Sequence, residues 1–246
     1  MGPLPAHCGR PVYCHRSVIK LKAVPEEKKS KTVFITGATG YMGTRLIKRL
    51  LEHEHHVIAL VRKGSEHKVP AGAEIITGDP FDADTFQQLI PSGCVFVQLL
   101  GVVHPSPKKA QQFKDIDLRS VKASADAAAN AGVAHFIYVS VGMERSRLME
   151  AYQEVRKEGE EYCIRKKLHC TFIRPWYVLG PGHWWPVILL PFYGLAELSP
   201  QLRKKARTKA LVTIKQMLST LMNTIESPAS PLRTLEIRDI RRGQKN

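Results

Sequence analysis

Cysteine is scarce in this chain of 246 residues, which contains only five of them. They are widely scattered and odd in number, which argues against a disulfide framework: Cys8, Cys14, Cys94, Cys163 and Cys170. Cys94 and Cys170 are expected to be core thiols, and Cys163 lies in a predicted helix with no base beside it to make it a nucleophile. A reducing, cytoplasmic setting fits best.

Long hydrophobic runs are also lacking. The most apolar stretch, Trp184–Leu198, is interrupted by Pro186 and Pro191 and is shorter than the roughly 20 residues of a transmembrane helix. We expect it to cover the core, line a pocket or form a dimer contact, with peripheral membrane contact as the alternative. The first thirty residues have no apolar region typical of a signal peptide. Nothing in the pattern indicates an oligomeric state.

Acidic residues are outnumbered, with 22 Asp and Glu against 37 Lys and Arg. Of the net charge of +15, residues 1–31 carry +5 and residues 199–246 carry +8, so the body is nearly neutral. Basic ends can attract nucleic acid or anionic lipid without a specific site. No recognition motif accompanies them, so we expect solvated ends and no specific nucleic-acid partner.

The uneven distribution of charge divides the chain into a leader, a body and a tail. Residues 1–31 are expected to be a basic, disordered leader, and 241–246 a mobile tail. Residues 32–240 are expected to form one domain, in which about 180–240 make a substrate-side lobe. No standard zinc spacing occurs, so no metal site is predicted. The histidines of "HEHH" (53–56) are expected in a solvated turn.

A glycine-rich turn at Gly37, Gly40 and Gly43 joins a predicted strand, Val33–Thr36, to a predicted helix. A second strand, Val57–Val61, follows, which is the context of a dinucleotide fingerprint. The first glycine permits a tight turn, the second lets the backbone approach a pyrophosphate, and the third lets the helix pack on the strand. The helix N-terminus would face the phosphates.

Arg62 stands where an NAD-preferring site usually has an acidic residue for the ribose 2′-hydroxyl. A guanidinium suits a 2′-phosphate instead. The sequence therefore favours NADP(H), with NAD(H) as the alternative.

Strands and helices continue to alternate, which predicts an α/β fold with a doubly wound parallel sheet. Helices are expected from near Asp82, over Asp115–Ala131 with a stop at Gly132, over Met149–Lys167, and over Thr213–Glu226 with Thr213 as N-cap. A last strand is expected over Leu235–Ile240. Ligands bind at the carboxyl ends of such strands, and the residues predicted there are Asp79, Leu100, Gly101, Ser140 and Pro175 to Val178.

Four segments together resemble the short-chain dehydrogenase/reductase superfamily: "TGATGYMG", "GD", "VSVG" and "FIRPWYVLGPG". Over about residues 32–226 the chain is similar to its atypical branch, NmrA-like or NAD-dependent-epimerase-like. The resemblance implies an NAD(P)-binding Rossmann fold with a compact substrate region. The cofactor-binding residues that it implies, together with the strand-end positions, are Gly37, Thr39, Gly40, Tyr41, Met42, Gly43, Arg62, Asp79, Leu100, Gly101, Ser140, Pro175, Tyr177 and Val178.

The resemblance also implies a catalytic set. Ser140 matches the family Ser, Tyr152 matches the Tyr, and Arg156 stands at the position of the Lys. The Arg156 charge could lower the pKa of the Tyr152 phenol, but a guanidinium cannot relay its own proton. Arg156 is therefore expected to act more as a ribose or structural contact. His104 is placed where it could contact substrate.

Three functions remain open. The first is an NADP(H)-dependent oxidoreductase on a small carbonyl or alcohol, with Tyr152 moving the proton and Ser140 fixing the oxygen. The second is a non-catalytic NADP-binding redox sensor, regulator or assembly factor of the NmrA-like type. The third, a nucleic-acid-associated protein, has the least support.

Overall fold

The computed structural model describes residues 2, 30–102, 106–144, 146, 149–182 and 211–243. Seven parallel strands form one sheet in the order β3-β2-β1-β4-β5-β6-β9. Their bounds are β1 Thr32–Thr36, β2 His56–Val61, β3 Glu74–Thr77, β4 Val95–Gln98, β5 His135–Val139, β6 Cys170–Ile173 and β9 Leu232–Leu235. The predicted doubly wound sheet is confirmed.

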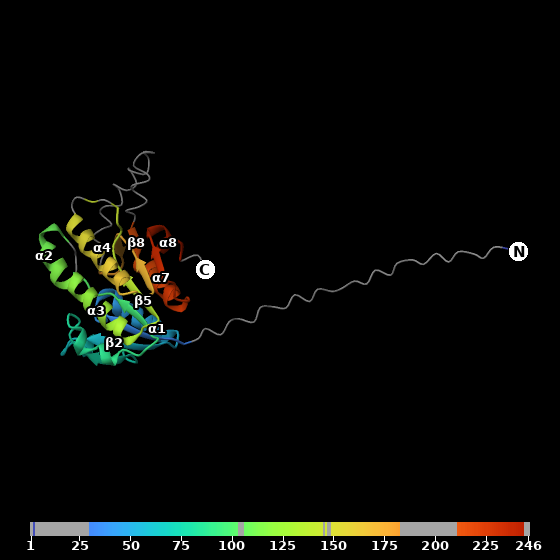
Figure 1. Ribbon diagram of the computed structural model, residues 1–246, viewed down its shortest axis with the longest axis horizontal. Helices are drawn as coiled ribbons and strands as arrows, with labels where there is room; N and C mark the ends of the chain where they lie inside the picture. The colour runs from blue at the N-terminus through green and yellow to red at the C-terminus, as the bar shows by residue number, and fades with distance from the viewer. Residues whose placement is uncertain are drawn as a thin grey trace.

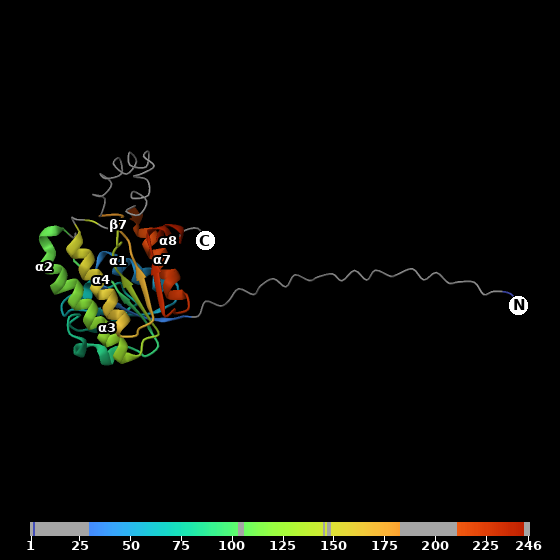
Figure 2. The ribbon, with the colours of Figure 1, turned by 45° about the horizontal axis from the view of Figure 1, so that its top comes forward.

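Helices cover both faces of this sheet (Figures 1 and 2). One face carries α1 (Tyr41–Glu52), α7 (Ile214–Glu226) and α8 (Ile237–Arg242), and the other carries α3 (Arg119–Ala131) and α4 (Glu150–Arg165). The short α2 (Ala110–Gln112) precedes α3.

Residues along β1 alternate between two hydrophobic cores. Val33 and Ile35 pack with Leu46 of α1 and Met217 of α7, whereas Phe34 packs in the core that includes Val121 of α3. Side chains that are apolar on both sides of a strand are typical of parallel sheets covered by helices on both faces.

The strand order reverses between β1 and β4, which are neighbours although two strands separate them in sequence. At such a switch point the connections leave in opposite directions and a crevice opens at the carboxyl ends of the strands. The loops after β1 and β4 therefore lie on the two sides of this crevice, which is where ligands bind in folds of this kind.

Residues 107–131 form one helical stretch rather than a helix that begins at Asp115. It starts with a 3-10 turn, passes through α2 and a π-helical segment at Phe113–Leu118, and continues as α3. The predicted end is confirmed: Gly132 caps α3 in the left-handed conformation, with a φ of 66°.

The helix expected from near Asp82 is absent. Two short 3-10 helices, Ala83–Thr85 and Gln87–Leu89, stand there instead. The Asp82 carboxylate accepts the backbone N–H of Asp84, and Pro91 follows shortly afterwards. The segment is short, and a side chain within it bonds to its own backbone. Tight turns are therefore favoured over an α-helix, whose first turn costs free energy to form.

The strand expected over Leu235–Ile240 is also wrong. β9 ends at Leu235, and Glu236 then opens α8 through a capping box with Asp239. Arg241 and Arg242, assigned above to a mobile tail, belong to α8. Residues 244–246 lie outside the described residues.

The C-terminal part, where it is described, packs against the rest of the domain. β9 extends the main sheet, α7 packs into the core beside α1, and β7 (Tyr177–Leu179) pairs with β8 (Leu211–Thr213). Thr213 caps α7 as predicted, in a capping box with Gln216. Trp184–Leu198 lies outside the described residues.

The N-terminal junction is anchored to the domain. Lys31, expected in the leader, donates through Nζ to the carbonyl oxygens of Ile225, Glu226 and Ser227 at 2.7, 3.1 and 3.0 Å. The rest of the predicted leader, 1–29, lies outside the description except for Gly2. Within the described residues, no helix combines the length and apolar character needed to cross a bilayer.

Candidate cofactor site

The glycine turn after β1 is as tight as the sequence predicts. Gly37 has a φ of 74°, and a Cβ atom on it would lie 2.7 Å from the backbone nitrogen of Leu100. A Cβ on Gly43 would lie 2.8 Å from the carbonyl oxygen of Ala38. The first glycine therefore lets the loops after β1 and β4 meet, and the third lets α1 pack against the turn.

The N-terminus of α1 opens at this turn without a side-chain cap. Gly40 occupies the N-cap position, and the first turn of α1 contains no acidic residue. The first N–H groups of a helix lack intrahelical partners and sit at the positive end of the helix dipole. This end of α1 can therefore accept an anionic group.

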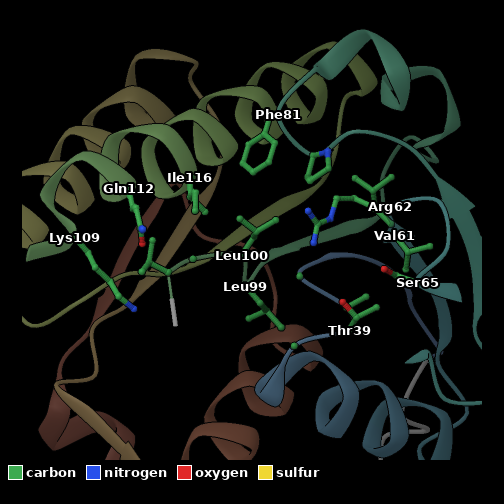
Figure 3. A pocket seen from close by; sticks show the side chains of 17 residues that line it. Thr39, Val61, Arg62, Ser65, Phe81, Leu99, Leu100, Lys109, Gln112 and Ile116 are labelled. Atoms are coloured by element: carbon green, nitrogen blue, oxygen red, sulfur yellow. The ribbon is translucent and has the colours of Figure 1, made fainter. Parts of the chain in front are cut away.

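A cavity of about 470 Å³ lies beside the turn (Figure 3). Its walls come from the glycine turn and the ends of β2, β3 and β4, and from the start of the long helical stretch. The lining residues are Gly37, Ala38, Thr39, Gly40, Leu60, Val61, Arg62, Ser65, Pro80, Phe81, Leu99, Leu100, Gly101, Val102, Lys109, Gln112 and Ile116.

Arg62 and Ser65 supply polar groups at the end of β2. Figure 3 shows the Arg62 guanidinium turned into the cavity toward Leu100. No Asp or Glu occurs among the described residues that line the cavity. This end of the cavity can therefore bind an anion. Its described lining residues include no carboxylate that could bind a ribose hydroxyl.

An apolar slot lies next to Arg62. Phe81 and Ile116 face it from one side and Leu100 from the centre of the cavity (Figure 3). Phe81 also lies 5.5 Å from the Arg119 guanidinium, measured to the ring centroid. Flat aromatic groups bind well between apolar side chains.

Asp79 does not line the cavity. Its Oδ1 accepts the backbone N–H of Phe81 at 3.0 Å, and its own N–H donates to Thr85 Oγ1 at 3.0 Å. Asp79 thus holds the turn that places Phe81.

Lys109 and Gln112 lie at the opposite end of the cavity from Arg62 and Ser65 (Figure 3). With Ile116 they share one side of the helical stretch. Sequence reasoning missed these three residues, along with Ser65 and Phe81. The "GDP" turn points to Phe81, but the π-helical segment changes the helical phase that would identify Ile116.

Ser140 stands directly after β5, where its backbone N–H donates to the carbonyl oxygen of Ile173 at 2.8 Å. The side chain is buried, and its Oγ has no hydrogen-bond partner among the described residues. It does not line the described cavity.

Tyr152 is buried on α4, and its ring lies 4.8 Å from that of Phe113. The Arg156 guanidinium lies 5.1 Å from the Tyr152 ring centroid. Burial raises the pKa of Tyr152 above its ordinary value, and the opposing effect of the Arg156 charge is smaller. The Arg156 charge acts on this pKa in the expected direction, but desolvation outweighs it and the net shift is upward.

Arg156 is 5% exposed and does not reach the cavity. It forms an ion pair with Asp117 and donates to the carbonyl oxygen of Val139 at 2.9 Å. It also donates to the Tyr138 hydroxyl at 3.3 Å. These bonds make the structural contact expected for Arg156.

The remaining predicted cofactor residues lie near the same edge of the sheet but outside the cavity lining: Tyr41, Met42, Gly43, Pro175, Tyr177 and Val178. The Tyr41 hydroxyl packs against Gly180, and the Pro175 carbonyl accepts the N–H of Gly142 at 2.9 Å. His104 lies outside the described residues.

The "HEHH" turn is only partly solvated. His55 is 5% exposed, and its Nδ1 accepts the backbone N–H of Lys31 at 3.1 Å. Across the described part of the chain, no group of three or more His, Cys, Asp or Glu residues is arranged to hold a metal ion. Cys94 and Cys170 are buried and free, as expected for core thiols, and Cys163 is buried and free as well.

Comparison with known proteins agrees with this geometry. Residues 37–180, more than half of the chain, match the family described as NAD(P)H-binding. The chain is 27% identical to a ceramide reductase of Caulobacter vibrioides over 85% of its own length and 65% of that protein. It is 28% identical to a chloroplastic divinyl chlorophyllide a 8-vinyl-reductase of Oryza sativa subsp. indica over 52% of its own length and 35% of that protein. The chain thus spans less than two thirds of the length of each of these relatives.

Solved structures share the fold. A UDP-galactose 4-epimerase superposes with a TM-score of 0.63 at 17% identity, covering 83% of this chain and 76% of the epimerase. The Bordetella bronchiseptica enzyme WbmG, in complex with NAD and UDP, superposes with a TM-score of 0.61 at 16% identity, covering 85% of this chain and 73% of the enzyme. The expected Rossmann fold is confirmed by these structures, and the chain belongs to the NAD(P)H-binding family.

Proposed function

We propose that this protein is an NADP(H)-dependent oxidoreductase that acts on a small carbonyl or alcohol. One observation carries the cofactor choice. The cavity beside the glycine turn is lined by Arg62 and Ser65 and by no described carboxylate. A ribose 2′-phosphate needs cationic and hydroxyl partners, whereas a ribose 2′-hydroxyl is typically bound by Asp or Glu.

The residues of the cavity fit the adenosine half of a dinucleotide. Phe81, Leu100 and Ile116 would hold the adenine ring, and Arg62 with Ser65 would hold the 2′-phosphate. The N-terminus of α1 would hold the pyrophosphate. The bound nicotinamide would supply the hydride chemistry. Two relatives that share sequence with the chain are named as reductases, which supports this class of reaction.

Fluorescence titration with NADPH and NADH tests the cofactor choice. Arg62→Ala should raise the Kd for NADPH at least tenfold and leave the Kd for NADH nearly unchanged. The matched control is Lys63→Ala, which removes the neighbouring exposed cation outside the cavity lining and should change neither value. Equal NADPH affinity of wild type and Arg62→Ala would refute the assignment.

A second candidate is an NADP-binding sensor or regulator without turnover. It is favoured by the burial of Tyr152 and Arg156 and by the raised pKa of the Tyr152 phenol, which disfavours proton release. Tyr152→Phe separates the two functions in an assay of NADPH oxidation with a panel of carbonyl compounds. An enzyme with Tyr152 as proton donor should lose at least 100-fold in kcat with an unchanged Kd for NADPH. The absence of turnover in the wild type across the panel would favour the sensor.

The cellular setting that we propose is the cytoplasm. Its support is the free state of Cys94, Cys163 and Cys170, which fits a reducing compartment.

A further inference from the structure

A buried ion pair lies directly behind one wall of the cavity. Asp117 comes from the π-helical segment and is 1% exposed, and Arg156 comes from α4 and is 5% exposed. The wall in front of them is the chain that leaves β4, where Gly101 and Val102 line the cavity.

Both charged groups touch the backbone of this wall. Asp117 Oδ2 accepts the N–H of Val102 at 3.1 Å, while Oδ1 accepts from Arg156 Nη2. A Cβ atom on Gly101 would overlap Arg156 Nη2 and would lie 2.8 Å from Asp117 Oδ1. The wall is therefore bonded at Val102 and packed against the guanidinium at Gly101.

The pair is also tied to the strands behind it. Arg156 Nη1 donates to the carbonyl oxygen of Val139 at 2.9 Å, at the end of β5. Ser120 Oγ donates to the carbonyl oxygen of Asp117 at 3.1 Å and accepts from Gln98 Nε2, at the end of β4, at 3.1 Å. The position of the wall is thus set by β4, β5 and α4 together.

A gain in the free energy of unfolding does not by itself explain why a buried ion pair is present here. Removing two charges from water costs free energy that their attraction often only offsets, and apolar residues of similar volume often serve as well. What an apolar replacement cannot provide is the acceptor for the Val102 N–H. The helical stretch that carries Asp117 also presents Gln112 and Ile116 to the cavity, so the pair fixes two walls relative to each other.

We propose that Asp117 and Arg156 are positioning residues for the dinucleotide, a buried ion pair that holds the Gly101–Val102 wall at the distance the cofactor requires. The inference rests on the proposed cofactor binding. It assigns Arg156 a role through the backbone of the cavity wall, without contact to substrate or cofactor.

The test compares Asp117→Asn and Arg156→Lys with Glu160→Gln. Glu160 lies one turn further along α4, is equally buried, and pairs with Arg174 at 3.0 and 2.5 Å away from the cavity. Thermal melts measure stability, and fluorescence titrations well below each Tm give the Kd for NADPH and for NADH.

We expect Asp117→Asn and Arg156→Lys to raise the Kd for NADPH and NADH by the same factor, at least tenfold, because the wall does not contact the 2′-phosphate. Glu160→Gln should lower Tm but change either Kd less than twofold. Arg62→Ala, by contrast, should change the ratio of the two affinities.

A double-mutant cycle keeps the test valid if Asp117→Asn does not fold. Gly101→Ala should weaken NADPH binding strongly in the wild type and much less in Arg156→Lys, because the smaller ammonium leaves room for the added methyl group. Additive effects would contradict the proposal, as would wild-type affinity in both ion-pair variants despite a lower Tm. A wild type that binds neither nucleotide would refute the proposed function itself.

Discussion

At the scale of the residue, backbone conformation alone does not explain why glycine stands at position 37. Gly37 and Gly93 have the same φ of 74°, but a Cβ atom on Gly93 would meet nothing within 4 Å. On Gly37 the same atom would lie 2.7 Å from Leu100 N and 2.9 Å from Leu99 C. The two positions separate conformational strain from the close approach of two loops.

Alanine at each position should reveal the difference. We expect Gly93→Ala to cost about 1–2 kcal/mol of unfolding free energy, the ordinary penalty of a left-handed residue. Gly37→Ala should cost a further ~2 kcal/mol or more and abolish NADPH binding, because the loop after β4 must move. Chemical denaturation and titration measure both effects. Equal losses of stability would show that the contact with Leu100 is unimportant.

Single residues of the site could be predicted where a motif names them or where they follow a predicted strand. The glycine spacing and Arg62 follow from the strand–turn–helix context, and the structure brings Gly37, Thr39, Gly40, Arg62, Leu100 and Gly101 to one cavity. The ion pair of Arg156 with Asp117 could not be predicted, because its partners lie 39 positions apart in sequence. The burial that raises the pKa of Tyr152 depends on the same packing.

At the scale of the element, helix ends were predictable where a side chain supplies the cap. Thr213 accepts the N–H of Gln216 at 3.2 Å, and the Gln216 side chain accepts the N–H of Thr213 at 2.8 Å. The end of α3 at Gly132 was predictable for another reason, because glycine readily adopts the left-handed conformation found there. The strand prediction for the segment after Leu235 failed because its alternating apolar residues resemble a strand, whereas Glu236 and Asp239 cap a helix.

Removing the α7 cap should therefore have a defined cost. Thr213→Ala should lower the free energy of unfolding by about 1 kcal/mol, because the Gln216 N–H loses its acceptor. Thr213→Ser keeps the hydroxyl and should stay within about 0.3 kcal/mol of wild type. Urea denaturation distinguishes the two. An alanine variant as stable as the serine variant would mean that the capping box contributes nothing.

At the scale of the whole molecule, the two edges of the sheet differ in chemistry. The carboxyl edge carries the cavity, whereas the opposite edge carries buried histidine. His135 begins β5, is 3% exposed, and has its Nε2 2.8 Å from Thr171 Oγ1. Burial lowers the pKa of His135 to about 4, assisted by the charges of Lys31, His169 and Arg233.

The buried His135 should make the free energy of unfolding depend on pH. The unfolded chain binds a proton at His135 below pH ~6.5, but the folded protein binds it only near the lowered pKa of about 4. The free energy of unfolding should therefore fall as pH falls between these values, by on the order of 2–3 kcal/mol. His135→Gln should flatten this dependence, and His67→Gln, at an exposed position, should retain it. Denaturation at several pH values decides; identical slopes for wild type and His135→Gln would contradict the account.

The global fold was the most predictable level, since alternating apolar strands and helices dictate a parallel sheet and the glycine turn marks its first strand. The order of the strands confirms that expectation and places the switch point between β1 and β4. The path of the C-terminal part was less predictable, because β9 joins the sheet through a pairing with β6 that no local pattern indicates.

The central claim is that the cavity beside the glycine turn holds the adenosine 2′-phosphate end of NADP(H). Calorimetric titration with 2′,5′-ADP and with 5′-ADP tests it most directly, because these ligands contain only the half of the cofactor that this cavity would hold. We predict that 2′,5′-ADP binds and that 5′-ADP binds at least tenfold more weakly. Equal affinity for both, or binding of neither, would contradict the claim.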